Sequence, residues 1–148
     1  GNGKLTYTTS NKAVATVDAA GKVTVKGLGV AKITVKAAAT TDYKAASKTV
    51  TVTVAPKKQS ISLVNKIKKQ LTIKWKKNTK ASGYQVVYST NKKFTGKKTV
   101  RKAKTTTSYK IKGLKKGKKY YVKVRSYKTV NGKRIYGAYS TAKKATIK

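Results

Sequence analysis

The sequence contains neither cysteine nor histidine, and it has only two acidic residues, Asp18 and Asp42. Without cysteine the chain has no disulfide framework and no thiolate metal site. Without histidine it lacks the commonest metal ligand and general base. Glycoside cleavage needs a pair of positioned carboxylates, and calcium takes about six to eight oxygen ligands, several of them carboxylates. We therefore predict no catalytic, cofactor-binding or metal-binding residues.

Both acidic residues have a structural explanation instead. Asp18 ends a predicted strand at a turn, where its side chain can accept hydrogen bonds from nearby backbone amides. Asp42 lies in a connection rich in threonine and alanine, and we expect the same role there. Apolar runs of membrane-spanning length and a signal-peptide pattern are also missing. We expect a soluble piece, with any export signal or membrane anchor outside it.

Positive charge dominates the composition. Thirty-eight lysines and arginines against two acids give a formal net charge of +36, whereas a small domain usually carries about 2 to 8 charges. Only Arg101, Arg125 and Arg134 are arginines. The other cations are lysines, whose flexible and strongly hydrated ammonium groups suit diffuse attraction better than bidentate readout of bases or phosphates. The composition favours solvation and non-specific attraction of anionic polymers.

The apolar residues predict an all-β chain. They are mostly β-branched or aromatic and recur at every second position, which argues against the disorder that a lysine-rich composition can indicate. In the first half, the predicted strands lie around Leu5 to Tyr7, Val14 to Val17, Val23 to Val25, Val30 to Val35, and Val50 to Val54. The only proline, Pro56, follows the last of these runs and marks a boundary between two halves.

In the second half, the predicted strands are Ile61 to Leu63, Leu71 to Trp75, Tyr84 to Tyr88, Lys97 to Lys102, Ser108 to Lys112, Tyr120 to Tyr127, and a return strand from Ile135 to Ile147. Asn131-Gly132 between the last two is a strong signal for a two-residue hairpin turn. Trp75 falls on the apolar face of its strand. We predict that it fills the core and does not serve as a platform for ligand stacking.

The strand that ends at Tyr127 carries the candidate binding surface. Its residues Tyr120, Val122, Val124 and Ser126 alternate with Tyr121, Lys123, Arg125 and Tyr127. The second set is our candidate polyanion-binding face, because interleaved aromatic rings and cations can stack on bases or sugars and neutralise phosphates. Alternatively, the cationic side chains pack over the tyrosines and stiffen an exposed sheet face. We favour packing, because lysine is spread along the whole chain.

Two blocks of the second half resemble fibronectin type III domains. The spacing of Leu114, Gly117 and Tyr120 is similar to the start of strand F in that family, and Trp75 followed by GYQVVYS is similar to strands B and C. The resemblance implies a complete seven-strand sandwich over residues 59–148, with Leu114 plugging a turn and Tyr120 buried in a tyrosine corner. Lys116 departs from the pattern, since the family usually has a turn proline there.

The first half resembles the bacterial immunoglobulin-like family (group 2) of invasin- and intimin-type surface proteins. The shared motifs are Ser10-Asn11, Val14-Ala15-Thr16-Val17-Asp18, Gly21-Lys22-Val23-Thr24, and Gly27, Gly29, Ala31 and Ile33-Thr34. The resemblance implies that residues 1–55 form a partial domain without its first two strands, joined to the second domain by linker residues 56–58. We expect two tandem immunoglobulin-like β-sandwiches, and in the first an open sheet edge near Leu5 to Thr9, or an exposed apolar face.

Three functions remain open. The first, which the resemblance implies, is a non-catalytic structural or adhesive module of a secreted or cell-surface bacterial protein. The second is binding of anionic polymers such as DNA, RNA, teichoic acid or sulfated glycan through diffuse lysine charge, and a glycan of the cell wall or of a host surface could also be a partner. Separately, the open edge of the first domain could pair with another copy. The third is an accessory region of an enzyme. Some immunoglobulin-like domains of pilins and adhesins also join a lysine to an asparagine beside a buried acid, and here only the first domain has acids.

Overall fold

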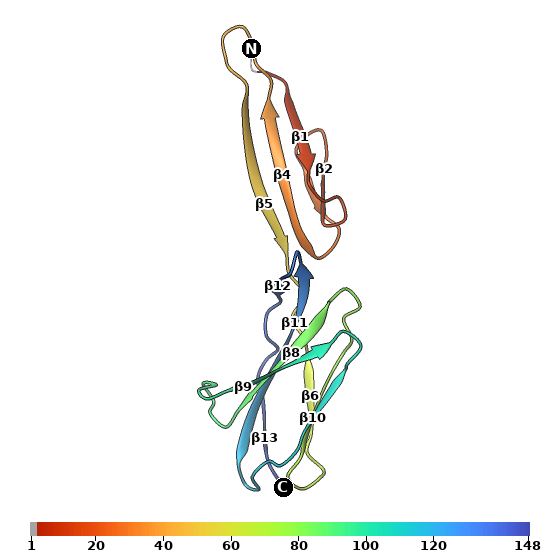
Figure 1. Cartoon of the computed structure of the whole chain (residues 1–148), viewed down its shortest axis with the longest axis vertical. Coiled ribbons are helices and arrows are strands. Elements are labelled where there is room, and N and C mark those ends of the chain that lie inside the picture. Colours follow the sequence, from red (N-terminus) through yellow and green to blue (C-terminus); the bar gives the residue numbers. More distant parts are fainter. Residues whose placement is uncertain (1–2) are drawn as a thin grey trace. The chain divides into compact units, whose positions relative to one another are not determined.

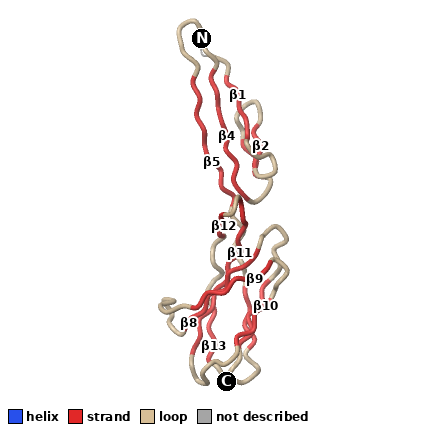
Figure 2. The backbone as a smooth tube through the Cα atoms, in the orientation of Figure 1, coloured by secondary structure: helices blue, strands red, loops and turns tan. Residues whose placement is uncertain are grey.

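The computed structural model describes residues 3–148, and every regular element within them is a β-strand (Figure 1, Figure 2). The chain divides into two compact units, Gly1–Val54 and Ala55–Lys148, which we call unit 1 and unit 2. The predicted all-β class is therefore confirmed. Among the described residues there is no helix that is long and apolar enough to cross a membrane.

Unit 1 contains the strands β1 (Leu5–Thr9), β2 (Ala15–Val17), β3 (Val23–Val25), β4 (Gly29–Ala37) and β5 (Ala46–Val54). In the antiparallel sheet, β4 lies between β1 and β5, while β2 and β3 form a separate hairpin. The buried cluster is small: Val14, Ala15 and Ala31, with Val52 and Val54 packed against it. The five strands thus enclose little apolar surface.

The sheet of unit 1 has open edges. Strands β1 and β5 each pair only with β4 in the described part of the chain. Leu5 on β1 is 51% exposed and Val50 on β5 is 53% exposed. The hairpin of β2 and β3 therefore leaves part of the apolar face uncovered, which confirms the expected open edge and exposed apolar surface.

Asp18 closes the turn between β2 and β3, as predicted. Its Oδ1 accepts hydrogen bonds from the backbone amides of Ala20 (2.9 Å) and Lys22 (2.8 Å). Gly21 in this turn has a φ of +84°, and the ring of Tyr7 lies against it. A side chain at Gly21 would be strained and would meet that ring, so the turn depends on glycine.

The prediction for Asp42 is wrong. Its side chain makes no hydrogen bond to any residue between 3 and 148, whereas the hydroxyl of Thr40 accepts one from the amide of Tyr43 at 3.2 Å. The backbone amide of Thr40 also donates to the carbonyl of Tyr43 at 2.9 Å. A threonine hydroxyl stabilises turns as an aspartate does, and Thr40 is placed to close this one.

Unit 2 contains β6 (Ile61–Val64), β7 (Leu71–Trp75), β8 (Gly83–Ser89), β9 (Lys98–Ala103), β10 (Ser108–Ile111), β11 (Lys119–Val130), β12 (Lys133–Tyr136) and β13 (Lys143–Thr146). One sheet has the order β10-β7-β6. The other has the order β12-β11-β8-β9, and β13 pairs with the first half of β11. All pairs are antiparallel. The seven strands predicted in this half are all present, and the return strand is divided into β12 and β13.

The core of unit 2 lies between these two sheets. Its buried members are Ile61, Leu71, Ile73, Trp75, Tyr84, Val86, Tyr88, Ile111, Leu114, Val122, Val124 and Ile147. The predicted burial of Trp75 is confirmed, since its side chain is 6% exposed and its ring lies 5.4 Å from that of Tyr84. Leu114 is buried as the resemblance implied. A cluster of this size stabilises unit 2 far more than the small cluster stabilises unit 1.

Tyr120 is half-buried, so the prediction that it is buried is wrong. It stands near the start of β11 and packs against the margin of the core. Within residues 3–148 its hydroxyl makes no hydrogen bond, while the hydroxyl of Tyr84 accepts one from the amide of Asn78 at 2.6 Å. The hydrogen bond that holds the loop between β7 and β8 is therefore made by Tyr84 on β8 and not by Tyr120.

The return strand is interrupted. It forms β12 after the turn at Asn131 and Gly132, whose φ angles of 50° and 75° are those of a two-residue hairpin turn. Regular pairing stops after Tyr136, although the amides of Gly137 and Ser140 still donate to the carbonyls of Ser126 and Val124 on β11, and the strand resumes as β13. The carbonyl of Pro56 lies where a side chain at Gly137 would be, so the start of unit 2 occupies this site. The predicted run from Ile135 to Ile147 covers β13 and the second half of β12, but the break at residues 137–142 was not predicted.

Candidate polyanion-binding face

The four residues of the candidate face lie on β11, opposite the core. Val122, Val124 and Ser126 are fully buried, whereas Tyr121, Lys123, Arg125 and Tyr127 are all half-buried. On the neighbouring β8, Lys123 is paired with Val87 and Arg125 with Gln85. Strand alternation therefore places the four residues on one face of the larger sheet, in which β11 lies between β12 and β8 (Figure 1).

Arg125 is held by three neighbours on this face. Its guanidinium carbon lies 3.7 Å from the ring centre of Tyr136 and 4.3 Å from that of Tyr139. Its Nε donates a hydrogen bond to Oε1 of Gln85 at 2.7 Å, and the hydroxyl of Tyr139 donates to the same oxygen at 3.0 Å. The guanidinium is therefore fixed in orientation by the hydrogen bond and by its contacts with two rings.

Lys123 is packed in the same way. Its Nζ lies 4.2 Å from the ring centre of Phe94 and 4.3 Å from that of Tyr139. Burial lowers the pKa of the Lys123 ammonium below its usual value, and the positive charges of Lys97 and Arg125 lower that pKa further. No nearby acidic side chain offsets these effects, because unit 2 has no acidic residue. The aromatic rings are the groups that stabilise this cation.

Tyr127 completes the arrangement at the end of β8. Its ring packs edge-on against Tyr136 at 5.7 Å, and the guanidinium of Arg134 lies 5.5 Å from its ring centre. The Tyr127 ring also covers Gly83, because a Cβ at that glycine would lie 2.5 Å from the hydroxyl oxygen. Gly83 is thus needed for the close approach of the ring to the strand.

Together these contacts form a continuous row, which we call the cation–aromatic ladder: Phe94, Lys123, Tyr139, Arg125, Tyr136, Tyr127 and Arg134. Beneath it, Val87 is fully buried although it points away from the core. The ladder therefore shields the outer face of β8 from water. Tyr121 carries no stacked cation within residues 3–148, so the structure brings together three of the four candidate residues.

Sequence reasoning missed three aromatic members of the ladder. Tyr136 could have been found, since a two-residue turn at Asn131-Gly132 sets it opposite Tyr127, as the register shows. Tyr139 follows the break in the return strand, and Phe94 lies in the loop after β8 with a φ of 60°. Period-two patterns say nothing about side-chain direction in such segments.

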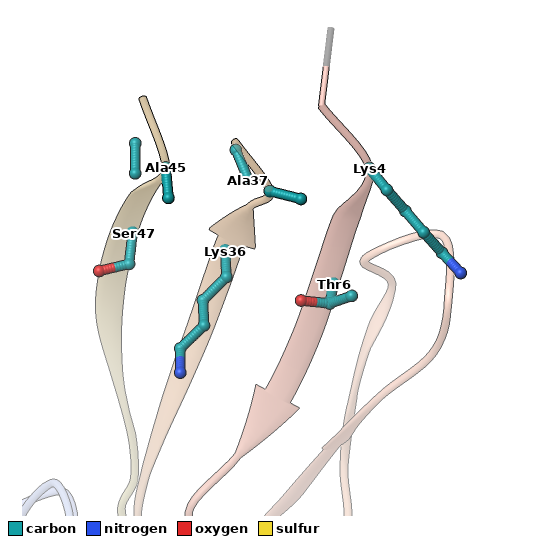
Figure 3. A pocket seen from close by; sticks show the side chains of 8 residues that line it. Lys4, Thr6, Lys36, Ala37, Ala45 and Ser47 are labelled. Carbon is teal, nitrogen blue, oxygen red and sulfur yellow. The ribbon is translucent and has the colours of Figure 1, made fainter. Parts of the chain in front are cut away.

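The described residues contain no cluster of acidic side chains that could hold a metal ion. A shallow hollow occurs on the outer face of unit 1, lined by Lys4, Thr6, Lys36, Ala37, Ala38, Ala45, Ala46 and Ser47 (Figure 3). The ammonium groups of Lys4 and Lys36 point away from one another in this view. The hollow therefore does not converge its two cations on one ligand.

Comparison with known families identifies both units. Residues 54–141 match the fibronectin type III domain, over more than half of the chain. The chain belongs to the fibronectin type III family. Residues 1–40 match the immunoglobulin-like domain of intimin. Both matches confirm the resemblances seen in the sequence, and both describe non-catalytic domains. No curated protein matches the chain.

Solved structures show the same fold. The sixth fibronectin type III domain of human fibronectin type III domain containing protein 3 is 16% identical with a TM-score of 0.53, over 65% of this chain and 89% of that one. The fn3 domain of human contactin 1 is 16% identical with a TM-score of 0.53, over 64% and 81%. The FN1–FN3 domains of chicken CNTN1 are 18% identical with a TM-score of 0.55, over 86% and 47%.

Proposed function

We propose that this chain is a non-catalytic structural and adhesive module of a secreted or cell-surface bacterial protein, and that its lysines bind anionic polymers without sequence preference. The intimin-type match of residues 1–40 supports a location on the bacterial surface, and fibronectin type III units are common spacers and binding platforms. The observation that carries the proposal is the charge: +36 in all, with both acids in the first 54 residues.

Diffuse attraction follows from how the cations are displayed. Most lysine side chains are exposed and stand on both units. A polyanion that approaches such a surface releases condensed counterions, so the binding free energy comes from many weak phosphate or sulfate contacts. The ladder cations contribute less than their number indicates, because Lys123 and Arg125 already stack on rings.

The test measures, by fluorescence anisotropy at several salt concentrations, how tightly the chain binds labelled duplex DNA, single-stranded RNA and a sulfated glycan. We expect similar affinities for duplexes of unrelated sequence, and log affinity that falls linearly with log salt at about 0.9 per phosphate neutralised on duplex DNA. If the affinity does not depend on salt, or if none of the three polymers binds at low salt, the polyanion-binding function is refuted and only the structural module remains.

We also propose that unit 1 pairs with another copy through a sheet edge. Strands β1 and β5 are the edges, and β5 alternates valine with threonine over Thr49–Val54. Unpaired edges of this kind recruit further strands, but like charge opposes the approach of two copies. We expect a monomer at low salt and a dimer at high salt by sedimentation. A Val50→Lys variant, which places a charge on β5, should stay monomeric at high salt. If this variant still forms the dimer, β5 is not the edge that pairs.

A further inference from the structure

Three segments meet at one end of unit 2, beside the C label in Figure 1: the turn of residues 65–70, the turn of residues 112–118, and residues 147–148. The amide of Leu114 donates to the carbonyl of Lys69, and the amide of Lys69 donates to that of Lys148, at 3.0 and 2.9 Å. Ile147 exchanges backbone hydrogen bonds with Gly117 and Lys118 at 2.8 and 2.9 Å. The three segments are thus joined through their backbones.

The side chains of this end point two ways. Leu114 and Ile147 are buried in the core and anchor their segments. Nine lysines of the end are exposed: Lys66, Lys68, Lys69, Lys112, Lys115, Lys116, Lys118, Lys119 and Lys148. We call these nine residues the lysine pole. None takes part in the cation–aromatic ladder, so their ammonium groups face solvent without an aromatic partner among those contacts.

The backbone fixes the pole before any ligand arrives. Gly113 and Gly117 have φ angles of 70° and 77°, and Lys69 has a φ of 56°, so both turns depend on left-handed residues held by the bonds above. Because the backbone of these turns is fixed, the lysines stay close together, and their ammonium groups repel one another within a Debye length of about 10 Å at moderate salt. Unit 2 supplies no acidic side chain to offset them. An anionic polymer would remove this repulsion at little cost in ordering entropy of the turns.

We propose that the lysine pole is the main contact surface for a phosphodiester polymer, an inference that rests on the proposed function and gives it a location. Lysine suits this polymer because each ammonium meets a phosphate as a point charge, without the planar geometry that base readout needs. A lipid surface fits less well. Ile67, 58% exposed, is the one large hydrophobic side chain exposed at this end in the described chain, and single exposed residues of this kind are ordinary.

The experiment compares two triple variants of the full chain that lose equal charge. The pole variant is K115Q, K116Q and K118Q, and the matched control is K76Q, K77Q and K80Q in the loop between β7 and β8, where all three lysines are also exposed. Affinity for a short duplex DNA and for poly(glycerol phosphate) is measured from low to moderate salt. Urea unfolding followed by the fluorescence of buried Trp75 checks that unit 2 of each variant is folded.

In the pole variant the fall of log affinity with log salt should become shallower by about 2 to 3, which is near one for each phosphate that the variant no longer neutralises. The control should change it by less than about 1. Replacing the same three pole lysines by arginine keeps the charge and should restore the slope. The polymer that binds more tightly identifies the source of the phosphodiester.

Equal losses of affinity in the two Gln variants would overturn the pole and leave the diffuse binding of the proposed function in place. Loss of all polymer binding in the unmodified chain would instead refute the proposed function itself. Binding to vesicles of anionic phospholipid that is tighter than to duplex DNA, and that Ile67→Ser weakens, would show that the pole contacts a membrane surface and would overturn the phosphodiester assignment.

Discussion

Replacing Arg125 by glutamine should destabilise unit 2, although the substitution removes one positive charge from a chain of formal charge +36. Two like charges about 10 Å apart in water repel by about 0.4 kcal/mol before salt screening, so relief of repulsion is worth a few tenths of a kcal/mol per neighbour. Against this, the variant lacks the stacking of Arg125 on Tyr136 and Tyr139 and its hydrogen bond to Gln85.

The stacking and the hydrogen bond outweigh the relief of repulsion. A stacked cation contributes about 0.5 to 1 kcal/mol per ring at a surface, and a hydrogen bond with one charged partner about 1.5 to 3 kcal/mol. Because Arg125 is half-buried and glutamine can make its own hydrogen bond to Gln85, we expect a net loss of about 1 to 2 kcal/mol. The free energy of unfolding is measured in urea through the emission of Trp75, the only tryptophan, which lies in unit 2.

The control is Lys110→Gln, at an exposed position on β10 with no stacked ring within residues 3–148. This variant should be unchanged or slightly more stable, since it loses charge without losing packing. Arg125→Gln should therefore lower the free energy of unfolding, whereas Lys110→Gln should leave it unchanged or raise it slightly. Equal shifts of the same sign would refute the structural role of the ladder, and Arg125 would then count as one more cation available for binding.

Three other perturbations test the packing of unit 2. Trp75→Ala should lower the free energy of unfolding by about 3 to 5 kcal/mol in urea monitored by circular dichroism, and a loss below about 1 kcal/mol would contradict its place in the core. Gly83→Ala should destabilise unit 2 and shift the aromatic NMR signals of Tyr127, which must move from its site above the glycine; unchanged signals would disprove that contact. For Lys123, whose pKa is lowered on folding from 10.5, stability should rise as the pH increases towards 10.5, because the unfolded chain then holds more protons. Burial raises the pKa of Tyr88 above 10.0. The stability that Tyr88 contributes is therefore fully present below pH 10.0 and is lost as the pH rises through the pKa that Tyr88 has in the folded chain. A Lys123→Met variant that keeps the whole rise would exclude Lys123 as its source.

Much of unit 2 could be predicted because its signals are local and agree with each other. Apolar residues at every second position located β7, β8 and β11, and Asn131-Gly132 located the hairpin to β12. The position of Trp75 on the apolar face of β7 was sufficient to predict its burial. Tyr120 was misjudged because alternation gives the face of a residue and not its distance from the end of the sandwich.

The ladder and the lysine pole depend on contacts between distant segments. Phe94 reaches Lys123 from a loop, and Tyr139 reaches it from a break in the return strand. The pole gathers lysines from turns that lie far apart in the sequence and are joined through backbone hydrogen bonds. The sequence shows that lysines are abundant, but tertiary structure decides which of them stack on rings and which remain exposed.

The most direct test of a cationic module that binds polyanions is the melting temperature of unit 2 across a salt series, with and without a short duplex DNA. Without DNA, added salt should raise the melting temperature until screening is complete, because the folded chain repels itself. With DNA, the melting temperature should be higher at low salt, since the ligand binds the folded state, and the two curves should merge as salt weakens binding. Melting temperatures that are insensitive to both salt and DNA would contradict the role of the charge.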